Sequence, residues 1–231
     1  MASAAGPNIV TDDLILHLDA ANTQSYPGSG TTWTDISGKG NSPTLTNGPT
    51  FNSDNMGSIV LDGTNDYVEF SPDGTITSDT VVLSGSYTAS FLFFSSNNGS
   101  NNDQMWLCEK NNGGNGLSLY RVSNGNVCIR TNTGGARYNW SCPYRTKIKN
   151  KLSFLDFVSN GTTLEFYLNN VSQGTVTPND LTLNVNRLGS NRFSDNQALD
   201  GRFYNVRFYD RALTRSEINQ NYNALRGRFG I

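Results

Sequence analysis

Apolar and polar residues alternate in short runs along most of the chain, and this alternation predicts β-strands. Residues 14–18 and 87–94 are nearly continuous in apolar character, as strands of a buried sheet are. Residues 58–70 read as a hairpin, and residues 105–108 as a short strand inside an Asn- and Gly-rich loop. From residue 116 onward, short strands recur about every ten residues between Asn-Gly or Gly-Gly turns. The pattern predicts an all-β, two-sheet antiparallel sandwich.

One segment near the end of the chain departs from the strand pattern and predicts a short helix. Thr214 is followed three residues later by Glu217, which is the spacing of a capping box. Ile218, Tyr222 and Leu225 then follow at i, i+4 and i+7, so they form one apolar face. We expect this face to pack on the sandwich.

Two-residue turns fix strand register, so the Asn-Gly and Gly-Gly dipeptides predict cross-strand partners. Turns at residues 124–125 and 134–135 place Arg121 opposite Cys128, and Arg130 opposite Asn139. Because side chains alternate between faces, the two hairpins are expected to have one core face and one polar face. The polar face is predicted to hold Arg121, Cys128, Arg130, Arg137 and Asn139. The core face is predicted to hold Tyr120, Val122, Val127, Ile129, Tyr138 and Trp140.

A turn at residues 160–161 places Asp156 opposite Glu165. Two facing carboxylates repel unless a cation intervenes, so we expect Arg207, Arg121 or Arg130 within salt-bridge reach. The same register predicts a set of side chains buried between the sheets, to which the alternation of the closing strand adds three residues. The set is Leu155, Phe157, Leu164, Phe166, Tyr204, Val206 and Phe208.

Two stretches carry a family resemblance. They are VLDGTNDYVEF at residues 60–70 and LDGRFYNVRFYDRAL at residues 199–213. With them, residues 14–222 resemble the laminin G-like branch of the concanavalin A-like lectin/glucanase superfamily. The resemblance implies a jelly roll at residues 13–226, between an N-terminal arm at 1–12 and a tail at 227–231. It leaves function open, because this scaffold carries lectins, hydrolases, lyases and structural modules.

Composition narrows the function classes. The net charge is −2, with 17 basic and 19 acidic residues, so no overall positive field attracts nucleic acid. No apolar run reaches the roughly 18 residues of a membrane helix, and the first seven residues lack the regions of a secretion signal. Three cysteines in no zinc-binding spacing favour free thiols, and a Cys128–Cys142 disulfide is the alternative.

Catalysis is disfavoured by the motifs that are missing. The E-x-D-x-x-E strand of the superfamily's glucanases does not occur, and His17 is the single histidine of the sequence. Ser–His or Cys–His catalysis therefore has no support. The alternative is a polysaccharide hydrolase or lyase that uses Asp156 and Glu165. Directly opposed residues lie about 5 Å apart, near the carboxylate separation of a retaining glycosidase.

Two loop clusters offer hard oxygen atoms, and the family resemblance connects them with calcium. The first contains Asp35 and Asn41, and the second contains Asp62 and Asp66. The favoured interpretation is Asx-turn chemistry, in which Asp and Asn side chains bind their own backbone. Calcium needs about six to eight oxygen ligands. The sequence does not place that many oxygen atoms at either cluster.

Aromatic and amide side chains suggest a sugar platform. Trp106, Tyr144 and Arg145 lie in or near Asn-rich loops, and Arg121, Arg130 and Asn139 belong to the predicted polar face. Aromatic rings stack on sugars while polar groups bind hydroxyls, as in concave sites with few polar groups. Packing of the loops on the sandwich is an equally good explanation.

Three further stretches resemble laminin G-like proteins of tailed bacteriophages, especially marine ones. They are SYPGSGTTW at residues 25–33, DISG at 35–38 and NGPTF at 47–51. The resemblance implies a non-catalytic, lectin-like virion protein that is made in the host cytoplasm and decorates the head or tail. Its expected partners are virion proteins, copies of itself and cell-surface glycans. The arm and the tail, with little to bury, are expected to make intermolecular contacts.

Overall fold

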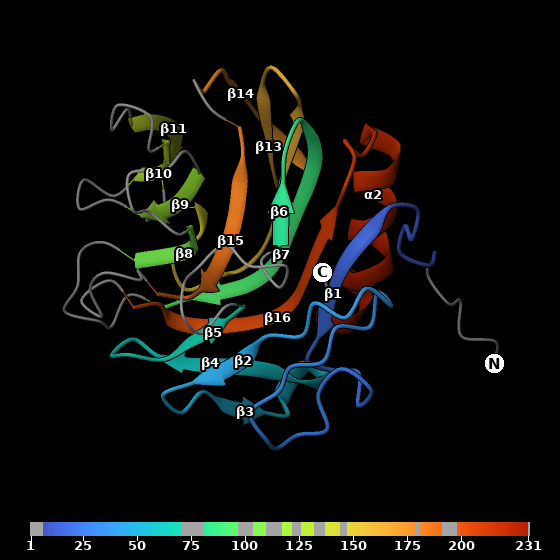
Figure 1. Ribbon diagram of the computed structural model, residues 1–231, viewed down its shortest axis with the longest axis vertical. Helices are drawn as coiled ribbons and strands as arrows, with labels where there is room; N and C mark the ends of the chain where they lie inside the picture. The colour runs from blue at the N-terminus through green and yellow to red at the C-terminus, as the bar shows by residue number, and fades with distance from the viewer. Residues whose placement is uncertain are drawn as a thin grey trace.

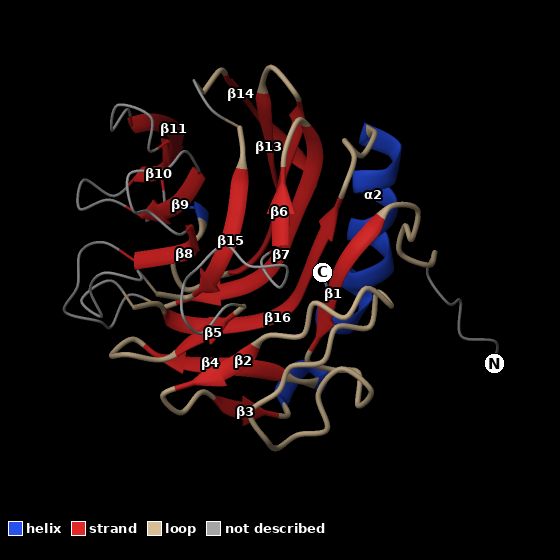
Figure 2. Ribbon diagram, viewed as in Figure 1, coloured by secondary structure: helices blue, strands red, loops and turns tan. Residues whose placement is uncertain are grey.

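The computed structural model describes residues 7–70, 81–96, 104–109, 117–121, 126–131, 137–143, 147–178, 181–190 and 198–230. The strands between residues 104 and 143 are described by their backbone pairing. In this part of the chain every paired strand named below runs antiparallel to its neighbours, in two sheets (Figures 1 and 2).

The two sheets confirm the predicted antiparallel sandwich, and the order of their strands is as follows. Sheet A has the order β14-β13-β12-β7-β16-β4-β3, with β1 paired to β16. Its strands are β1 (Leu14–Asp19), β3 (Thr50–Asn52), β4 (Ser58–Asp62), β7 (Ser86–Ser95), β12 (Leu152–Asn160), β13 (Leu164–Leu168), β14 (Val171–Val176) and β16 (Asp200–Tyr209). Sheet B has the order β11-β10-β9-β8-β15-β5-β2, with β6 paired to β15. Its strands are β2 (Thr44–Thr46), β5 (Tyr67–Glu69), β6 (Val81–Leu83), β8 (Gln104–Glu109), β9 (Leu117–Arg121), β10 (Asn126–Thr131), β11 (Arg137–Pro143) and β15 (Leu183–Leu188).

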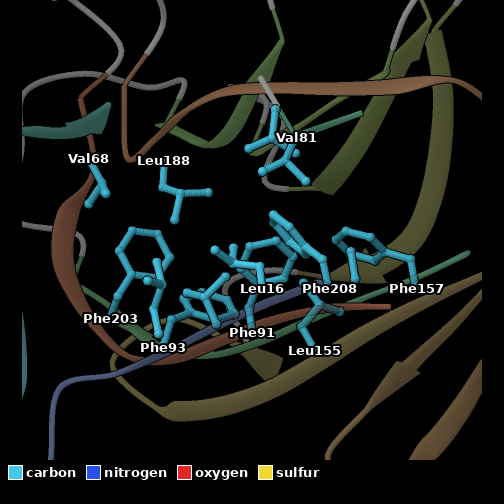
Figure 3. Packing of buried hydrophobic residues seen from close by; sticks show 14 of the residues in the cluster. Leu16, Val68, Val81, Phe91, Phe93, Leu155, Phe157, Leu188, Phe203 and Phe208 are labelled. Atoms are coloured by element: carbon cyan, nitrogen blue, oxygen red, sulfur yellow. The ribbon is translucent and has the colours of Figure 1, made fainter. Parts of the chain in front are cut away.

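The core lies between the sheets and is rich in phenylalanine. Phe91 packs against both Phe157 and Phe208, with ring centroids 5.5 and 5.7 Å apart. Sheet B closes the same cluster with residues such as Val68 and Leu188 (Figure 3). Four of the residues predicted for this core, on β12 and β13, are buried there, which confirms the prediction for them: Leu155, Phe157, Leu164 and Phe166.

Strand β16 corrects one prediction about this core. Val206 and Phe208 lie between the sheets as expected, but the third inward residue is Phe203 and not Tyr204. Tyr204 is buried against Leu225 on the opposite side of sheet A. The cause is an irregularity in the pairing of β16 with β7, between Phe203 and Asn205, which breaks the alternation of faces there.

The prediction of a hairpin at residues 58–70 is wrong. β4 pairs with strands of sheet A, and β5 pairs with strands of sheet B, so the connection crosses from one sheet to the other. Side chains within the connection hold its shape. Oδ1 of Asp62 accepts a hydrogen bond from the amide of Thr64, and Oδ2 of Asp66 accepts one from the amide of Asp62.

Three predicted registers, each deduced from a two-residue turn, are also wrong. Between β12 and β13 the last pair is Ser159 with Leu164, so residues 160–163 form the turn. Oδ1 of Asn160 accepts the amides of two residues within this turn and stabilises it. Between β9 and β10, Arg121 pairs with Val127, one residue away from the expected register.

In the next hairpin the shift is two residues. Cys128, not Arg130, pairs with Asn139, and Arg130 pairs with Arg137. A shift of two residues keeps the predicted faces, whereas the shift of one between β9 and β10 exchanges them. The strands of Cys128 and Cys142 are neighbours, as the disulfide alternative requires, although the register partner of Cys128 is Asn139.

Helix α2 (Arg215–Arg226) confirms the predicted helix and covers the outer face of sheet A (Figure 1). The capping box of Thr214 and Glu217 is present. Ile218 is buried, and the ring of Tyr222 lies 4.8 Å from that of Phe154. Short 3-10 turns, η1 (Asp54–Met56) and η4 (Gly227–Phe229), contact each other at one end of this layer.

Parts of the N-terminal arm and of the tail pack within this chain. The amide of Val10 donates to Oδ1 of Asn221 in α2, and the hydroxyl of Tyr209 donates to the carbonyl of Val10. At the other end, Phe229 packs edge-on against Tyr204. The prediction that the arm and tail have little to bury is wrong for residues 8–10 and 228–229, because α2 and β16 offer them an apolar surface. Residues 1–6 and 231 lie outside the described residues.

Candidate functional site

A row of polar side chains crosses the outer face of sheet A beneath helix α2. Its members are directly paired from strand to strand. In order from β1 to β13 they are His17, Arg207, Ser90, Asp156 and Tyr167. Arg207, Ser90 and Asp156 are almost fully buried, at 3%, 1% and 6% exposure. This buried row contains one of the two carboxylates proposed for the enzyme alternative.

Asp156 and Glu165 do not form the predicted facing pair. Asp156 is paired with Tyr167, and Glu165 is paired with Val158, so the two carboxylates are diagonal neighbours. Diagonal neighbours on one face lie about 7–8 Å apart. The Oε1 atom of Glu165 accepts a hydrogen bond from Ser172 at 2.8 Å. The separation that suggested a retaining glycosidase is therefore not present.

The predicted arginine partner is not found either. Among the described residues, the ion pairs within 4.0 Å join Arg187 to Glu69, Arg211 to Asp13 and Glu217, and Arg228 to Asp19. Burial raises the pKa of Asp156, while the neighbouring Ser90 side chain and then the charges of Arg207 and Arg215 oppose this rise. Asp156 is thus compensated by its neighbours in the row and not by an ion pair within 4.0 Å.

His17 is a member of the same row and behaves as a buried neutral side chain. Burial, then the charge of Arg207, lowers the pKa of His17 to about 4. Its Nε2 lies 3.2 Å from Nδ2 of Asn205, which suits a neutral ring that accepts a hydrogen bond.

The first of the two candidate calcium clusters binds its own backbone. Oδ1 of Asp35 accepts the amides of His17 and Ser37, and Oδ2 accepts the amide of Asn41. The side-chain amide of Asn41 donates to the carbonyl of Ile15. These contacts pin the loop to β1 and leave the carboxylate surrounded by N–H donors, which does not fit a cation.

The second cluster follows the same pattern. Asp62 and Asp66 accept backbone amides within their own turn, and burial raises the pKa of Asp66. In the described part of the chain, no three acidic, histidine or cysteine side chains gather as a metal site requires. Both clusters therefore make the backbone hydrogen bonds that the Asx-turn interpretation predicts.

A preorganised polar cluster lies on sheet B, at the pairing of β5 with β15. The guanidinium carbon of Arg187 lies 3.8 Å from the centre of the Tyr67 ring. Nη2 of Arg187 donates to Oε1 of Glu69 at 3.1 Å and to the hydroxyl of Tyr67 at 3.2 Å. Val68, between Tyr67 and Glu69, is in the core, so the cluster occupies the outer face of the sheet. Stacking and charge-assisted hydrogen bonds hold the arginine in one place.

The structure brings four of the predicted sugar-binding residues into the same sheet. Trp106, Arg121, Arg130 and Asn139 belong to β8, β9, β10 and β11. Trp106 stands at an irregularity in the pairing of β8 with β9, between Met105 and Leu107. Bulges often occur beside binding sites, where they redirect a side chain.

One of these four residues is set apart from the others within the sheet. Arg121 pairs with Val127, so its position in the register is separated from that of Arg130 and Asn139. Tyr144 and Arg145 lie outside the described residues.

Sequence reasoning missed the cluster of Tyr67, Glu69 and Arg187. A signal was available, because Tyr67 and Glu69 alternate with the apolar residues Val68 and Phe70 and so share a face. The partner strand is more than one hundred residues away, and no turn dipeptide fixes its register. The position of Arg187 opposite Glu69 was therefore not predictable from local pattern.

Two cavities among the described residues lie away from both carboxylates. One, of about 440 Å³, is lined by the turns at Gly85 and Gly161 and by Pro178. The other, of about 340 Å³, is lined by residues that include Phe94 and Arg202. Neither cavity includes Asp156 or Glu165, so neither supports the enzyme alternative.

The fold and the strand pattern agree with a family comparison. Residues 62–219 match the family model described as the concanavalin A-like lectin/glucanases superfamily. The chain belongs to this superfamily. The match runs from the last residue of β4 to the first turn of α2, and it therefore includes the cluster on sheet B. No curated protein gives a significant match.

Several solved structures resemble the whole sandwich at low sequence identity. One is domain 4 of AbnA, an extracellular arabinanase from Geobacillus stearothermophilus, in complex with arabinotriose. It has 19% identity and a TM-score of 0.65, and the match covers 91% of this chain and 98% of that domain.

Toxin binding domains resemble the chain equally well. The binding domain of Paraclostridial Mosquitocidal Protein 1 has 16% identity and a TM-score of 0.64, with 93% of this chain and 52% of that chain covered. The ligand-binding domain of botulinum neurotoxin serotype D, in complex with N-acetylneuraminic acid, has 17% identity and a TM-score of 0.63, with 92% and 51% covered. The chain thus spans about half of these toxin domains. At such identities the likeness shows the fold alone.

Among the described helices, none has the length and apolar character needed to cross a membrane.

Proposed function

We propose that this chain is a non-catalytic carbohydrate-binding module and that the outer face of sheet B binds the glycan. The observation that carries the proposal is the preorganised cluster of Arg187, Tyr67 and Glu69 on that face. The outer face of sheet A is covered by α2 and residues 8–10, so we assign the glycan to the other sheet.

The chemistry of the cluster suits a sugar. Binding sites for small ligands combine apolar or aromatic surface with a few fixed polar groups. Arg187 is fixed by Tyr67 and Glu69, so little conformational entropy would be lost when it binds a ligand. Trp106, at the irregularity in β8, stands in the next strand of the sheet beyond β15 and is our candidate for stacking on the sugar ring.

Absence of catalysis is part of the proposal. A polysaccharide hydrolase or lyase needs two carboxyl groups that reach the substrate. Asp156 is 6% exposed beneath α2, and Glu165 is diagonal to it and bonded to Ser172. This geometry supports a binding module over the enzyme alternative.

We further propose that the module is displayed on a virion of a tailed bacteriophage, where its partners are virion proteins or copies of itself. The support is the resemblance of residues 25–33, 35–38 and 47–51 to laminin G-like phage proteins. Mass spectrometry of purified particles from a producing culture tests this point. Absence of the chain from particles that contain all other structural proteins would overturn the virion proposal and leave glycan binding untouched.

Binding to a glycan array tests the main proposal, followed by titration calorimetry with the best ligand. We expect Trp106→Ala to weaken binding about tenfold, the loss of roughly 1.4 kcal/mol of contact energy. Met56→Ala, an exposed residue of η1 outside sheet B, is the matched control and should bind normally. Unchanged affinity of the Trp106 variant would contradict this site.

A reducing-sugar assay on the same ligands addresses catalysis. We expect no product from the unmodified chain. Product formation that Glu165→Gln abolishes, in a variant with normal thermal unfolding, would establish the enzyme alternative instead.

A further inference from the structure

Charged residues are divided unequally between the two sheets. The described strands of sheet B contain four arginines and two glutamates, and those of sheet A contain five acidic residues and two arginines. The residues of sheet B are Arg121, Arg130, Arg137, Arg187, Glu69 and Glu109. Those of sheet A are Asp19, Asp62, Asp156, Glu165, Asp200, Arg202 and Arg207. Sheet B is therefore positive within a chain whose net charge is −2.

Register places three of the arginines of sheet B along one line across the strands. Glu69 of β5 pairs with Arg187 of β15, which pairs with Cys108 of β8. Leu107 pairs with Leu119, so the next step of that register sets Cys108 beside Ser118 of β9. The line continues through two more strands, because Ser118 pairs with Arg130 and Arg130 pairs with Arg137.

The register sets Arg130 directly opposite Arg137 on the neighbouring strand. Like charges directly opposite each other in a sheet destabilise it. In the described strands of sheet B, the acidic residues are Glu69, which already pairs with Arg187, and Glu109, which stands opposite the core residue Val185. No carboxylate of these strands is thus in register with the arginine pair, and a bound anion would remove the repulsion.

Arg187 stands at one end of the line and is held in place there. Its Nη2 donates to Glu69 and to Tyr67, its side chain is 14% exposed, and its Nε is buried. By register, the positive charge without an opposing carboxylate is that of Arg130 and Arg137 at the other end of the line. That end therefore favours a negatively charged ligand.

We propose that the glycan bound by sheet B is an acidic polysaccharide whose carboxylate or sulfate groups lie along the line from Arg187 to Arg137. This inference rests on the proposed function and specifies its ligand class. Neighbouring strands are about 4.8 Å apart, so four strand steps separate these arginines by roughly 19 Å. A span of this size favours an extended polymer with repeated charges over a single small anion.

Affinity electrophoresis and calorimetry on the purified full chain test the proposal with four probes. Alginate carries carboxylates, ι-carrageenan carries sulfates, dextran is neutral, and duplex DNA is a polyanion without sugar-acid groups. The test variant is the double substitution Arg130→Gln/Arg137→Gln. The control is Lys39→Gln/Arg226→Gln, which removes the same charge at two exposed positions outside the strands of sheet B.

We expect alginate, ι-carrageenan or both to bind, with affinity that falls as salt increases. The double variant should bind at least about tenfold more weakly, since each charge-assisted hydrogen bond is a strong one. The control should match the unmodified chain. Binding of one acidic polymer and not the other supports the proposal and assigns the acidic group. Because removal of a like-charge pair relieves repulsion, the double variant should also unfold no more easily than the unmodified chain.

Other outcomes overturn the inference. Binding of dextran as tightly as the acidic polymers would retain the proposed function but reject the acidic ligand. Binding of DNA as tightly as any polysaccharide would show a general polyanion site. Failure to bind any polysaccharide, here and on the glycan array, would reject the proposed function as well.

Discussion

Arg211 donates one hydrogen bond to each carboxylate oxygen of Glu217, at 2.9 and 2.7 Å. This bidentate contact ties the first turn of α2 to Arg211, which lies just after the end of β16. Oε2 of Glu217 also accepts the amide of Thr214 as part of the capping box. The arginine contact and the cap together lower the pKa of Glu217 to about 2.

Glu217→Gln should therefore destabilise the chain in a pH-dependent way. The pKa of Glu217 is depressed from 4.5 to about 2, so its stabilising contribution is complete above pH 4.5 and is lost as the pH falls toward 2. We expect the difference in free energy of unfolding between the unmodified chain and the variant to shrink over that range. Urea unfolding at several pH values measures it, with Thr214→Ala, expected to cost about 1 kcal/mol, as a capping control. A difference that does not change with pH would contradict this account.

The core between the sheets predicts a large effect of truncation at Phe157. This side chain is fully buried and contacts Phe91 and Phe166. Phe157→Ala should lower the free energy of unfolding by about 3–5 kcal/mol. Val171→Ala is the control, since Val171 is 60% exposed and should change stability by no more than about 0.5 kcal/mol. Similar midpoints in urea for both variants would show that Phe157 is not in the core.

His17 predicts a loss of stability on mild acidification. Its pKa is lowered from 6.5 to about 4 in the folded chain, so the unfolded chain binds the proton more readily between these values. Stability should fall as the pH decreases from 6.5 toward 4. His17→Gln removes the titrating group, and its unfolding free energy should decline less over this interval. Parallel pH profiles of the two proteins, measured by urea unfolding, would rule out this role.

We predict that the side chain of Asn221 holds residues 8–10 in place. Its Oδ1 accepts the amide of Val10, and its Nδ2 donates to the hydroxyl of Tyr209. Asn221→Ala leaves these buried groups unsatisfied and should cost about 1–3 kcal/mol. Hydrogen exchange should show lost protection at the Val10 amide. Asn219→Ala, at an exposed position of the same helix, is the control. Retained protection at Val10 in the Asn221 variant would show that the contact does not hold the segment.

Local pattern predicted the strands and the helix because both depend on short-range periodicity. The alternation in β12 and β13 put Phe157 and Phe166 on the core side, and a register error of two residues did not change that assignment. The same error moved Asp156 away from Glu165, since a cross-strand pair requires the exact partner. Asn160 binds two amides within a four-residue turn, and this wider turn cannot be told from a two-residue Asn-Gly turn by the dipeptide alone.

The candidate site could not be predicted from local pattern, because it is formed by strands that are far apart in the sequence. The outer-face cluster joins Tyr67 and Glu69 to a strand about 120 residues later in the chain, with contacts spanning 118 and 120 residues. The irregularity between Phe203 and Asn205 likewise depends on packing against β7 and has no glycine or proline to mark it. The charged face of sheet B arises from such pairings, so its composition was visible in the sequence and its arrangement was not.

The packing of residues 8–10 and 228–229 against the helix-covered side of sheet A determines how the domain would be oriented when tethered. A neighbouring module, a particle surface or an affinity tag joined near either end would attach on that side. The arginine-bearing face would then point away from the anchor, toward the surrounding medium. An immobilised chain should for this reason keep its binding capacity whichever terminus is fixed, and arrays of copies could present many such faces to one long polymer at once.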